Sequence, residues 1–155
     1  MSNYKGILFQ VGSDSVRNST EWGCYVTESP YIPVPKKVKN ITSQSWYDEH
    51  GDDEYIPDVL YYESVETTLK FVYKGTVTDA KTSIKSFINY LGSGYFKFYD
   101  EFYKIGRQQV RLTGFSDDAE LKYVSNASDE CVATFSVEIK INDPVTEIVL
   151  LYENL

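Results

Sequence analysis

Hydrophobic and polar residues alternate along two long stretches of the chain. Between Val65 and Lys74 one face carries Val65, Thr67, Leu69, Phe71 and Tyr73. Between residues 131 and 141 the apolar face is more regular, with Cys131, Ala133, Phe135, Val137, Ile139 and Ile141. A period of two places successive side chains on opposite faces of a sheet. Both stretches are therefore predicted strands, and residues 131–141 are expected to run through the middle of a sheet.

Shorter patterns predict further strands. Weaker alternation covers Trp22 to Val26, Phe96 to Phe98 and Val110 to Leu112, and continuous apolar runs cover Ile7 to Phe9 and Ile148 to Leu151. Together with the two long stretches these segments predict roughly seven strands. The mostly polar segment from Ser116 to Glu130 is predicted to be a connection within a hairpin.

One helix is predicted, over residues 79–91. Its apolar positions recur at intervals of three and four: Ala80, Ile84, Phe87, Ile88 and Leu91. Thr78 or Asp79 is the expected N-cap, and Gly92 is the expected stop. The apolar face of such a helix is stabilised by packing on a sheet. The predicted fold is therefore α+β and mostly β: one domain over residues 1–155, with an antiparallel β-sandwich or barrel-like sheet flanked by a single α-helix.

The segment from Glu28 to Ser64 predicts a long arm without regular structure. Prolines lack the N–H that strand pairing requires, and four of them lie here: Pro30, Pro33, Pro35 and Pro57. The acidic run from Asp48 to Glu54 favours a solvated segment. Apolar anchors flank this run at Trp46, Tyr47, Tyr55 and Ile56. Long loops with such anchors are typical of segments that dock on another surface.

Composition and net charge disfavour some classes of function. The 155 residues include 15 basic and 23 acidic side chains, which give a net charge of -8. This sign disfavours binding to phosphate backbones, and no apolar run reaches the roughly 20 residues of a membrane helix. The chain is 15% aromatic with 14 Tyr, which favours either a β-rich fold or a surface for assembly or ligand binding. The N-terminus resembles no signal peptide, so Cys24 and Cys131 are expected to be reduced and buried, with a disulfide between them as the alternative.

Candidate chemistry is sparse. The acidic run does not have the spacing of a calcium loop, and His50 has no second His or nearby Cys for a zinc site. Gly106 permits a bulge or a positive backbone angle. Arg107 is interpreted either as the partner of a carboxylate or as a solvated charge beside a bulge, and the solvated charge is favoured. We find no phosphate-binding loop and no nucleophile motif. The sequence thus predicts a non-enzymatic protein with no catalytic residue, metal or cofactor.

The second half of the chain has a distinctive order of elements. A strand, Val65 to Lys74, comes first and is followed by the helix Asp79 to Leu91, which ends at Gly92-Ser93-Gly94. A hairpin from Tyr95 to Phe115 comes next and contains the turn Tyr99-Asp100 and the triplet Ile105-Gly106-Arg107. A late strand then leads into Asn142-Asp143-Pro144-Val145-Thr146. This arrangement resembles the tail-tube fold of contractile and non-contractile phage tails. It is also similar to the ring-forming domain of distal tail proteins, although full distal tail proteins are longer and usually add a domain.

The resemblance implies a structural subunit of a phage or prophage-derived tail. Six copies would form a ring in which strands pair between subunits, and the arm would reach the adjacent ring. The implied partners are further copies of the chain and other tail proteins, with DNA as cargo that an acidic lumen repels. The implied location is the virion tail, after assembly in the bacterial cytoplasm. The expected inter-subunit contacts are Trp46, Tyr47, Tyr55, Ile56 and Arg107. The alternative function is a carbohydrate-binding module that uses exposed Tyr and Trp.

Overall fold

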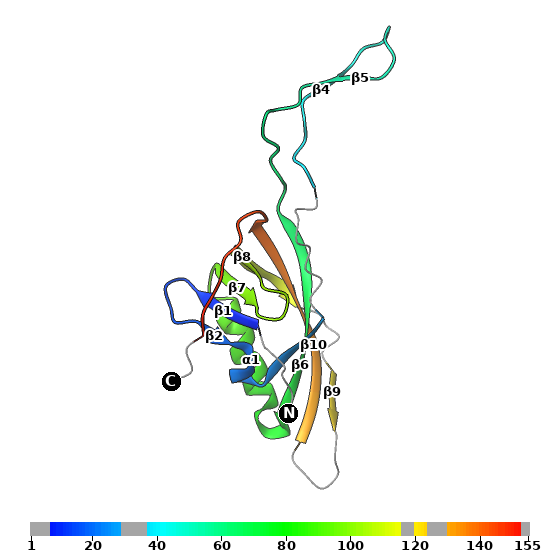
Figure 1. Cartoon of the computed structure of the whole chain (residues 1–155). Coiled ribbons are helices and arrows are strands. Elements are labelled where there is room, and N and C mark those ends of the chain that lie inside the picture. Colours follow the sequence, from blue (N-terminus) through cyan, green and yellow to red (C-terminus); the bar gives the residue numbers. More distant parts are fainter. Residues whose placement is uncertain (1–6, 29–36, 116–119, 124–129, 153–155) are drawn as a thin grey trace.

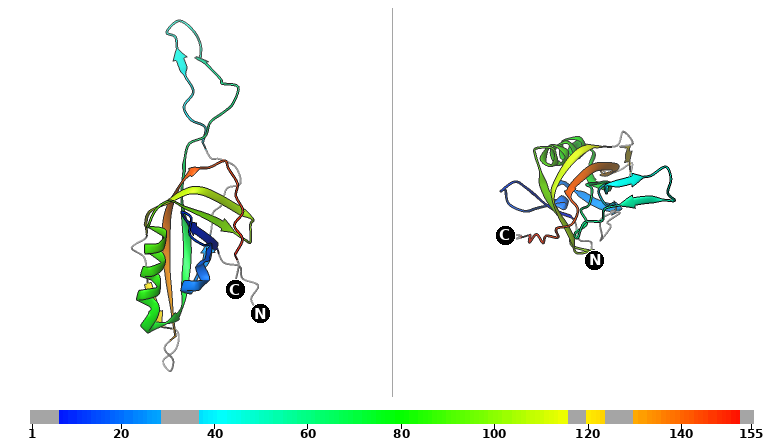
Figure 2. Two further views of the ribbon diagram at one scale, coloured as in Figure 1. Left: turned by 90° about the vertical axis from the view of Figure 1, so that its left-hand side faces the viewer. Right: turned by 90° about the horizontal axis from the view of Figure 1, so that it is seen from above.

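A computed structural model describes residues 7–28, 37–115, 120–123 and 130–152. Within these residues the fold is a curled antiparallel sheet with one α-helix against its inner face, which confirms the predicted α+β class (Figure 1). Figure 2 shows the sheet bent into a half-barrel. The strands are β1 (Ile7–Val11), β2 (Arg17–Asn18), β3 (Cys24–Glu28), β4 (Ser43–Ser45), β5 (Asp52–Glu54), β6 (Val65–Thr76), β7 (Phe96–Asp100), β8 (Ile105–Phe115), β9 (Glu120–Tyr123) and β10 (Glu130–Asp143).

Strand β10 is the centre of the sheet, as its strict alternation predicts. The order is β2-β1-β7-β8-β10-β6-β3, and β9 also pairs with β10. One edge of β10 pairs with β6 along its length, from Glu130 opposite Thr76 to Ile141 opposite Val65. Its other edge is shared, because β9 pairs with its first half and β8 with its second half. The longest predicted strands are thus the ones that hold the sheet together.

The helix α1 (Val77–Leu91) covers the inner face of β6 and β10. It begins earlier than predicted, because Thr76 is the N-cap: its hydroxyl accepts a hydrogen bond of 3.1 Å from the N–H of Asp79. Gly92 ends the helix as predicted, and its N–H donates to the carbonyl of Ile88. The 12-residue strand β6 therefore runs directly into the helix, and Asp79 lies in the first turn.

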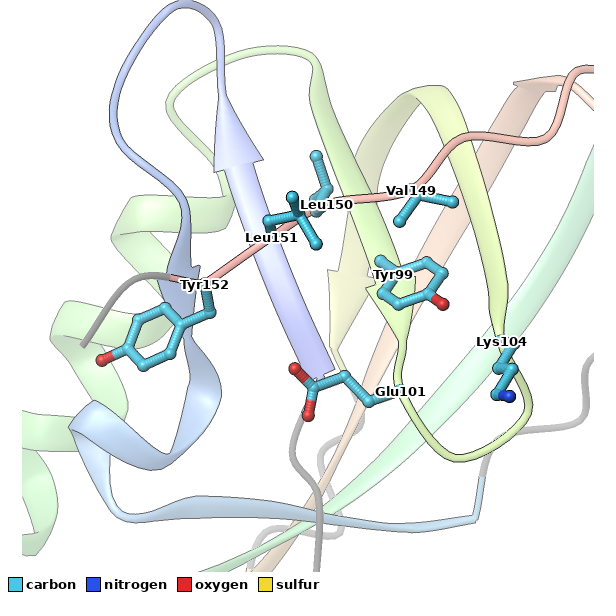
Figure 3. Close-up of a pocket in the computed structure, with 7 residues that line it drawn as sticks. All are labelled: Tyr99, Glu101, Lys104, Val149, Leu150, Leu151 and Tyr152. Atoms are coloured by element: carbon cyan, nitrogen blue, oxygen red, sulfur yellow. The ribbon is translucent and has the colours of Figure 1, made fainter.

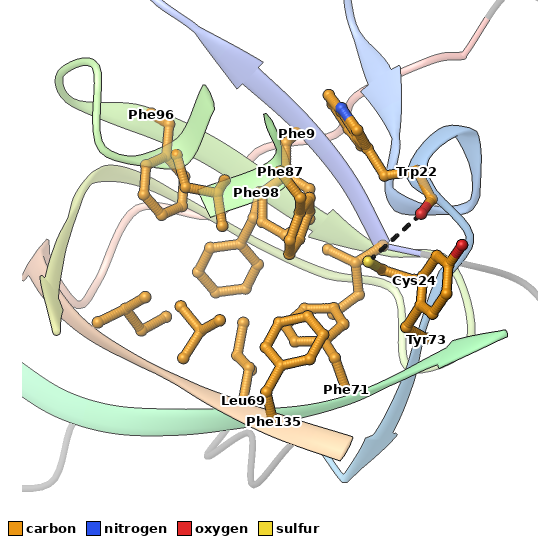
Figure 4. Packing of buried hydrophobic residues seen from close by; sticks show 14 of the residues in the cluster. Phe9, Trp22, Cys24, Leu69, Phe71, Tyr73, Phe87, Phe96, Phe98 and Phe135 are labelled. Carbon is orange, nitrogen blue, oxygen red and sulfur yellow. Dashed lines mark hydrogen bonds between the residues drawn. The ribbon is translucent and has the colours of Figure 1, made fainter. Parts of the chain in front are cut away.

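Aromatic side chains fill the space between the sheet and the helix (Figure 4). Phe87 of α1 lies at the centre of this core. Its ring centroid is 5.2 Å from that of Phe71, 5.8 Å from Phe9 and 6.2 Å from Phe135, in edge-to-face arrangements that aromatic quadrupoles favour. Trp22 closes the cluster at 5.3 Å from Phe87. Six of the eight Phe side chains are therefore buried in the core, whereas among the described Tyr side chains the buried one is Tyr73.

Three further predictions differ from the structure. Trp22 ends a short 3-10 helix, η1 (Ser19–Trp22), which is capped by Asn18 and ended by Gly23 at φ 73°, so the strand starts only at Cys24. The polar connection after Ser116 contains β9, while residues 116–119 and 124–129 lie outside the described residues. The apolar run Ile148 to Leu151 forms no strand.

The segment after β10 runs back along the β7–β8 hairpin (Figure 1). Asp143 fixes the backbone where this segment begins, because its carboxylate accepts hydrogen bonds from the N–H groups of Val145 and Thr146 at 3.3 and 3.1 Å. We refer to residues 144–152 as the C-terminal strap. No helix among the described residues is long and apolar enough to span a membrane.

Candidate functional site

The segment before β6 is a narrow hairpin that stands clear of the rest of the molecule (Figures 1 and 2). Its described part, residues 37–64, is called the arm below. The absence of regular structure predicted here is wrong, because β4 and β5 pair antiparallel with Ser43 opposite Glu54 and Ser45 opposite Asp52. Residues 29–36, including Pro30, Pro33 and Pro35 of the prediction, lie outside the described residues.

The base of the arm is joined by backbone hydrogen bonds and one ion pair. The N–H of Lys39 donates to the carbonyl of Tyr61 at 2.8 Å, and the N–H of Glu63 donates to the carbonyl of Lys37 at 2.8 Å. The Lys37 ammonium lies 3.4 Å from the Glu63 carboxylate. This ion pair is exposed and contributes little. The two chains of the hairpin are therefore held mainly by backbone pairing.

A tight turn forms the tip of the arm. The N–H of Glu49 donates to the carbonyl of Trp46 at 3.3 Å, and Gly51 adopts φ 78°, which glycine reaches without strain. The turn leaves the Tyr47 side chain fully exposed, at 107% relative accessibility, and the Trp46 side chain half exposed at 50%. The tip thus presents two large aromatic groups to its surroundings.

Farther along the shaft, Tyr55 and Ile56 are also exposed. The four anchors predicted from the sequence therefore share one projecting element, with Trp46 and Tyr47 at its tip. An isolated two-stranded hairpin is marginally stable in water, because it has no hydrophobic face to bury. Burial against a partner would supply about 1.5–3 kcal/mol for a large apolar side chain. The arm has the geometry of an element that completes its packing on another surface.

The arm tip is also strongly acidic. Asp48, Glu49 and the three residues of β5 are all exposed. In β5 each acidic residue lies opposite a neutral polar residue of β4, so cross-strand pairs bring no like charges together. Among the described residues no group of three or more His, Cys, Asp or Glu side chains is arranged to hold a metal ion, and His50 is exposed. The tip is a charged surface flanked by aromatic groups.

Arg107 is buried, which corrects its interpretation as a solvated charge. Only 4% of the residue is accessible. Its Nη1 atom donates to the carbonyl of Gly106 at 3.0 Å and lies 3.7 Å from a carboxylate oxygen of Glu147 in the strap. The expected pairing with a carboxylate is confirmed, but within the chain. Arg107 therefore offers little surface for the inter-subunit contact predicted from the sequence, whereas the arm residues offer much.

The two cysteines are not joined in a disulfide and are buried in the core, as expected. Burial raises the pKa of Cys24 to about 12, because the thiolate would lose its hydration. Its Sγ lies 3.7 Å from the carbonyl of Trp22 (Figure 4). Cys131 is 4% accessible. Neither thiol has the exposed, electropositive surroundings of a reactive cysteine.

A shallow pocket of about 320 Å³ lies where the strap crosses the β7–β8 turn (Figure 3). It is lined by Tyr99, Glu101, Lys104, Val149, Leu150, Leu151 and Tyr152. The turn itself exposes Phe102 at 73% and Tyr103, whose rings meet edge to face at 4.9 Å. In the strap Leu151 is 78% exposed. We call Phe102, Tyr103, Val149 and Leu151 the turn patch.

The turn patch is not predicted by the sequence pattern, although one signal is present. Two adjacent aromatic residues at 102 and 103 follow the acidic pair Asp100-Glu101, a place where a turn is expected and exposed aromatic side chains are unusual. The Asp100 carboxylate fixes this turn by accepting hydrogen bonds from the N–H groups of Phe102 and Tyr103 at 2.7 and 3.2 Å. Exposed apolar groups held in a defined turn mark an interaction surface.

Part of the sheet edge is open. Strand β7 pairs with β8 only as far as Phe96 opposite Val110. Beyond this point residues 111–115 pair with β10 on one side, and no strand among the described residues pairs with their other edge. An open edge is a template for pairing with another chain.

Comparison with known proteins assigns no family. No protein-family model matches the chain, and no curated protein matches it at a significant level.

Proposed function

We propose that the protein is a non-enzymatic structural subunit that assembles with further copies of itself into a ring or tube, in the manner expected for a phage or prophage-derived tail. The observation that carries the proposal is the arm, which projects from the body and exposes Trp46, Tyr47, Tyr55 and Ile56. A protein that acted alone would gain nothing from holding these side chains in water.

The open edge of β8 supports the same proposal. Residues 111–115 have no strand partner on their outer side within the described part of the chain. Pairing with a strand of a neighbouring copy would cover this side and would extend the sheet around a ring. The arm would then link subunits along a second direction. Two separate surfaces are what an assembly beyond a dimer requires.

Charge fits the role of a DNA conduit. The net charge of -8 repels phosphate, so a lumen formed by this chain would let DNA pass without binding it. The other partners under this proposal are neighbouring tail proteins, in the virion tail and during its assembly in the bacterial cytoplasm.

The carbohydrate-binding alternative has less support. The rings that would have to form a stacking platform on the sheet are in the core, including Phe9, Phe71 and Phe135 (Figure 4). The exposed aromatic groups of the arm lie on a slender hairpin. Sugar binding usually relies on rings held rigidly by their scaffold.

The experiment measures absolute mass by light scattering over a concentration series, with negative-stain images of the same fractions. Rings or tubes with a central hole are the expected result. Deletion of residues 44–56 should leave a folded protein that no longer assembles. The same loss is expected for the double variant Trp46→Ser with Tyr47→Ser, since it removes the apolar tip without shortening the chain.

Tyr95→Ser is the matched control, because Tyr95 is an exposed aromatic residue of the body, before β7. This variant should assemble normally. Unchanged assembly of the arm deletion, or a strict monomer of the native chain up to about 1 mM, would contradict the proposal. Binding of that monomer to a glycan array would favour the sugar-binding alternative.

A further inference from the structure

Two of the groups of exposed apolar side chains among the described residues lie on separate elements. One is the arm tip, with Trp46 and Tyr47, and the other is the turn patch, of which Val149 and Leu151 line the pocket. Single exposed apolar residues are ordinary on protein surfaces, but grouped ones mark a place of contact. Each group therefore needs a partner surface.

The two groups do not meet within one molecule. The arm leaves the body at the end where β6 begins and points away from it (Figure 1). The strap starts near the same end and runs in the opposite direction, toward the pocket (Figures 1 and 3). With about 11 residues from base to tip at about 3.3 Å each, the hairpin reaches up to about 36 Å outward. A second copy can present its pocket at that distance.

The pocket suits an aromatic side chain. A volume of about 320 Å³ is at the lower end of the range for ligand sites, which suits one or two side chains rather than a large molecule. Beside the charged residues Glu101 and Lys104, its lining is aromatic and aliphatic: Tyr99, Val149, Leu150, Leu151 and Tyr152. Tyr and Trp are the residues that most often anchor protein interfaces in such pockets.

Charge indicates which aromatic segment fits. Lys104 lines the pocket, and Lys97 lies on the same outward face of β7 as Tyr99. The lining also contains the acidic residue Glu101. The side chains of Lys97, Lys104 and Glu101 together therefore carry a net charge of +1. The residues that follow Tyr47 are acidic, beginning with Asp48 and Glu49. An acidic tip approaching two lysines is electrostatically complementary.

We propose that the arm tip of one copy docks on the pocket of a second copy, with Trp46 and Tyr47 against the turn patch and the acidic tip beside Lys97 and Lys104. The contact is head to tail, because two different surfaces meet. Repetition of such a contact gives a ring when the rotation closes and a filament or tube when it does not. The inference rests on the proposed function and specifies which surface receives the arm.

Disulfide trapping tests the contact itself. One variant carries Tyr47→Cys and the other Leu151→Cys, and equal amounts are mixed and mildly oxidised. The native thiols are buried, so the background is small. We expect a cross-linked heterodimer in the mixture, formed at least about tenfold faster than with Thr134→Cys in place of Leu151→Cys. Thr134 is exposed on the outer face of β10, away from the core.

Charge reversal gives a second readout, measured as the association constant. Lys104→Glu should weaken association at least about tenfold, and Asp48→Lys with Glu49→Lys on the arm should restore it. Lys85→Glu changes an exposed lysine of α1 and should have no such effect.

The outcomes separate this inference from the proposed function. Trapping without rings or tubes would support the contact and contradict the ring or tube assembly. Rings or tubes that form normally, with no trapping at Leu151 and no effect of Lys104→Glu, would keep the assembly and overturn the docking of the arm on the pocket. Absence of both trapping and assembly would overturn both.

Discussion

The backbone of Gly106 contacts the backbone of Ile148 so closely that a side chain at position 106 would overlap the Ile148 carbonyl oxygen. The N–H of Ile148 donates to the carbonyl of Gly106 at 3.4 Å. Gly106 is therefore required for close approach, not for the positive backbone angle considered from the sequence, which occurs instead at Lys104 and Gln109. This contact holds the strap against β8 and shapes the pocket.

Gly106→Ala is expected to displace the strap. The added methyl group has no space, so we expect a loss of about 1–3 kcal/mol in the free energy of unfolding, measured in urea. Amide hydrogen exchange at Ile148 should also become faster. Gly94→Ala is the control, because nothing lies within 4 Å of a Cβ there. Equal stability of the two variants would contradict the close contact.

Arg107 and Glu147 should contribute unequally to stability. Arg107→Ala removes a buried group and its hydrogen bond to Gly106, so a loss of about 1–3 kcal/mol is expected. Glu147→Gln should lose less than about 1 kcal/mol, because the Glu147 side chain is 64% exposed and its charge is screened. Urea denaturation of both variants checks the order. A larger effect of Glu147→Gln would disprove it.

Asp143 gives the strap a pH-dependent anchor. Burial tends to raise the pKa of Asp143, but hydrogen bonds from Gln108, Thr146 and Val145 outweigh it and hold this pKa below its usual value. A carboxyl group whose pKa is lowered by folding stabilises the fold above its unfolded pKa of about 3.9, and this contribution is lost as the pH falls through the folded value.

Asp143→Asn should therefore destabilise the protein at neutral pH. The difference in the free energy of unfolding between this variant and the native chain should shrink as the pH is lowered below about 4. Urea denaturation at several pH values measures it. Asp53→Asn is a control from the exposed arm tip and should show little difference at any pH. A gap for Asp143→Asn that stays constant with pH would contradict the anchor.

Phe87 should be the most sensitive position of the helix. Phe87→Ala empties the centre of an aromatic cluster and is expected to lower the free energy of unfolding by about 3–5 kcal/mol. Lys85→Ala, two residues away and exposed, should change it by less than about 0.5 kcal/mol. Thermal or urea denaturation distinguishes the two. Similar values would mean that the helix does not pack as described.

Periodic burial made most of the body predictable. The strands β6 and β10 and the helix α1 each bury one face, and this leaves a period of two or of three to four in the sequence. The start of α1 was misplaced because Thr76 caps the helix while it still belongs to β6. Alternation shows the buried face of a strand but not the residue at which the backbone changes direction.

The structures of the arm and the strap were less predictable, because periodic burial leaves no such pattern in these two segments. Strands β4 and β5 bury neither face, so Ser43–Ser45 and Asp52–Glu54 carry no hydrophobic pattern. The run Ile148 to Leu151 has the composition of a buried strand, yet it crosses the hairpin outside any strand, with a backbone hydrogen bond from Ile148 to Gly106. The pocket is formed by residues that are far apart in the sequence, such as Tyr99 and Val149, and a local sequence pattern does not predict contacts of this kind.

The pairing of β10 with β6 also sets an order of events during synthesis. The two halves of this ladder are separated by the helix and the β7–β8 hairpin, so β6 lacks this partner until residues 130–143 have left the ribosome. The arm hairpin closes over a short loop and precedes β6, so it can form much sooner. A nascent chain thus has its arm outside the ribosome before its core can be completed, and the edge of β6 that pairs with β10 stays open until then.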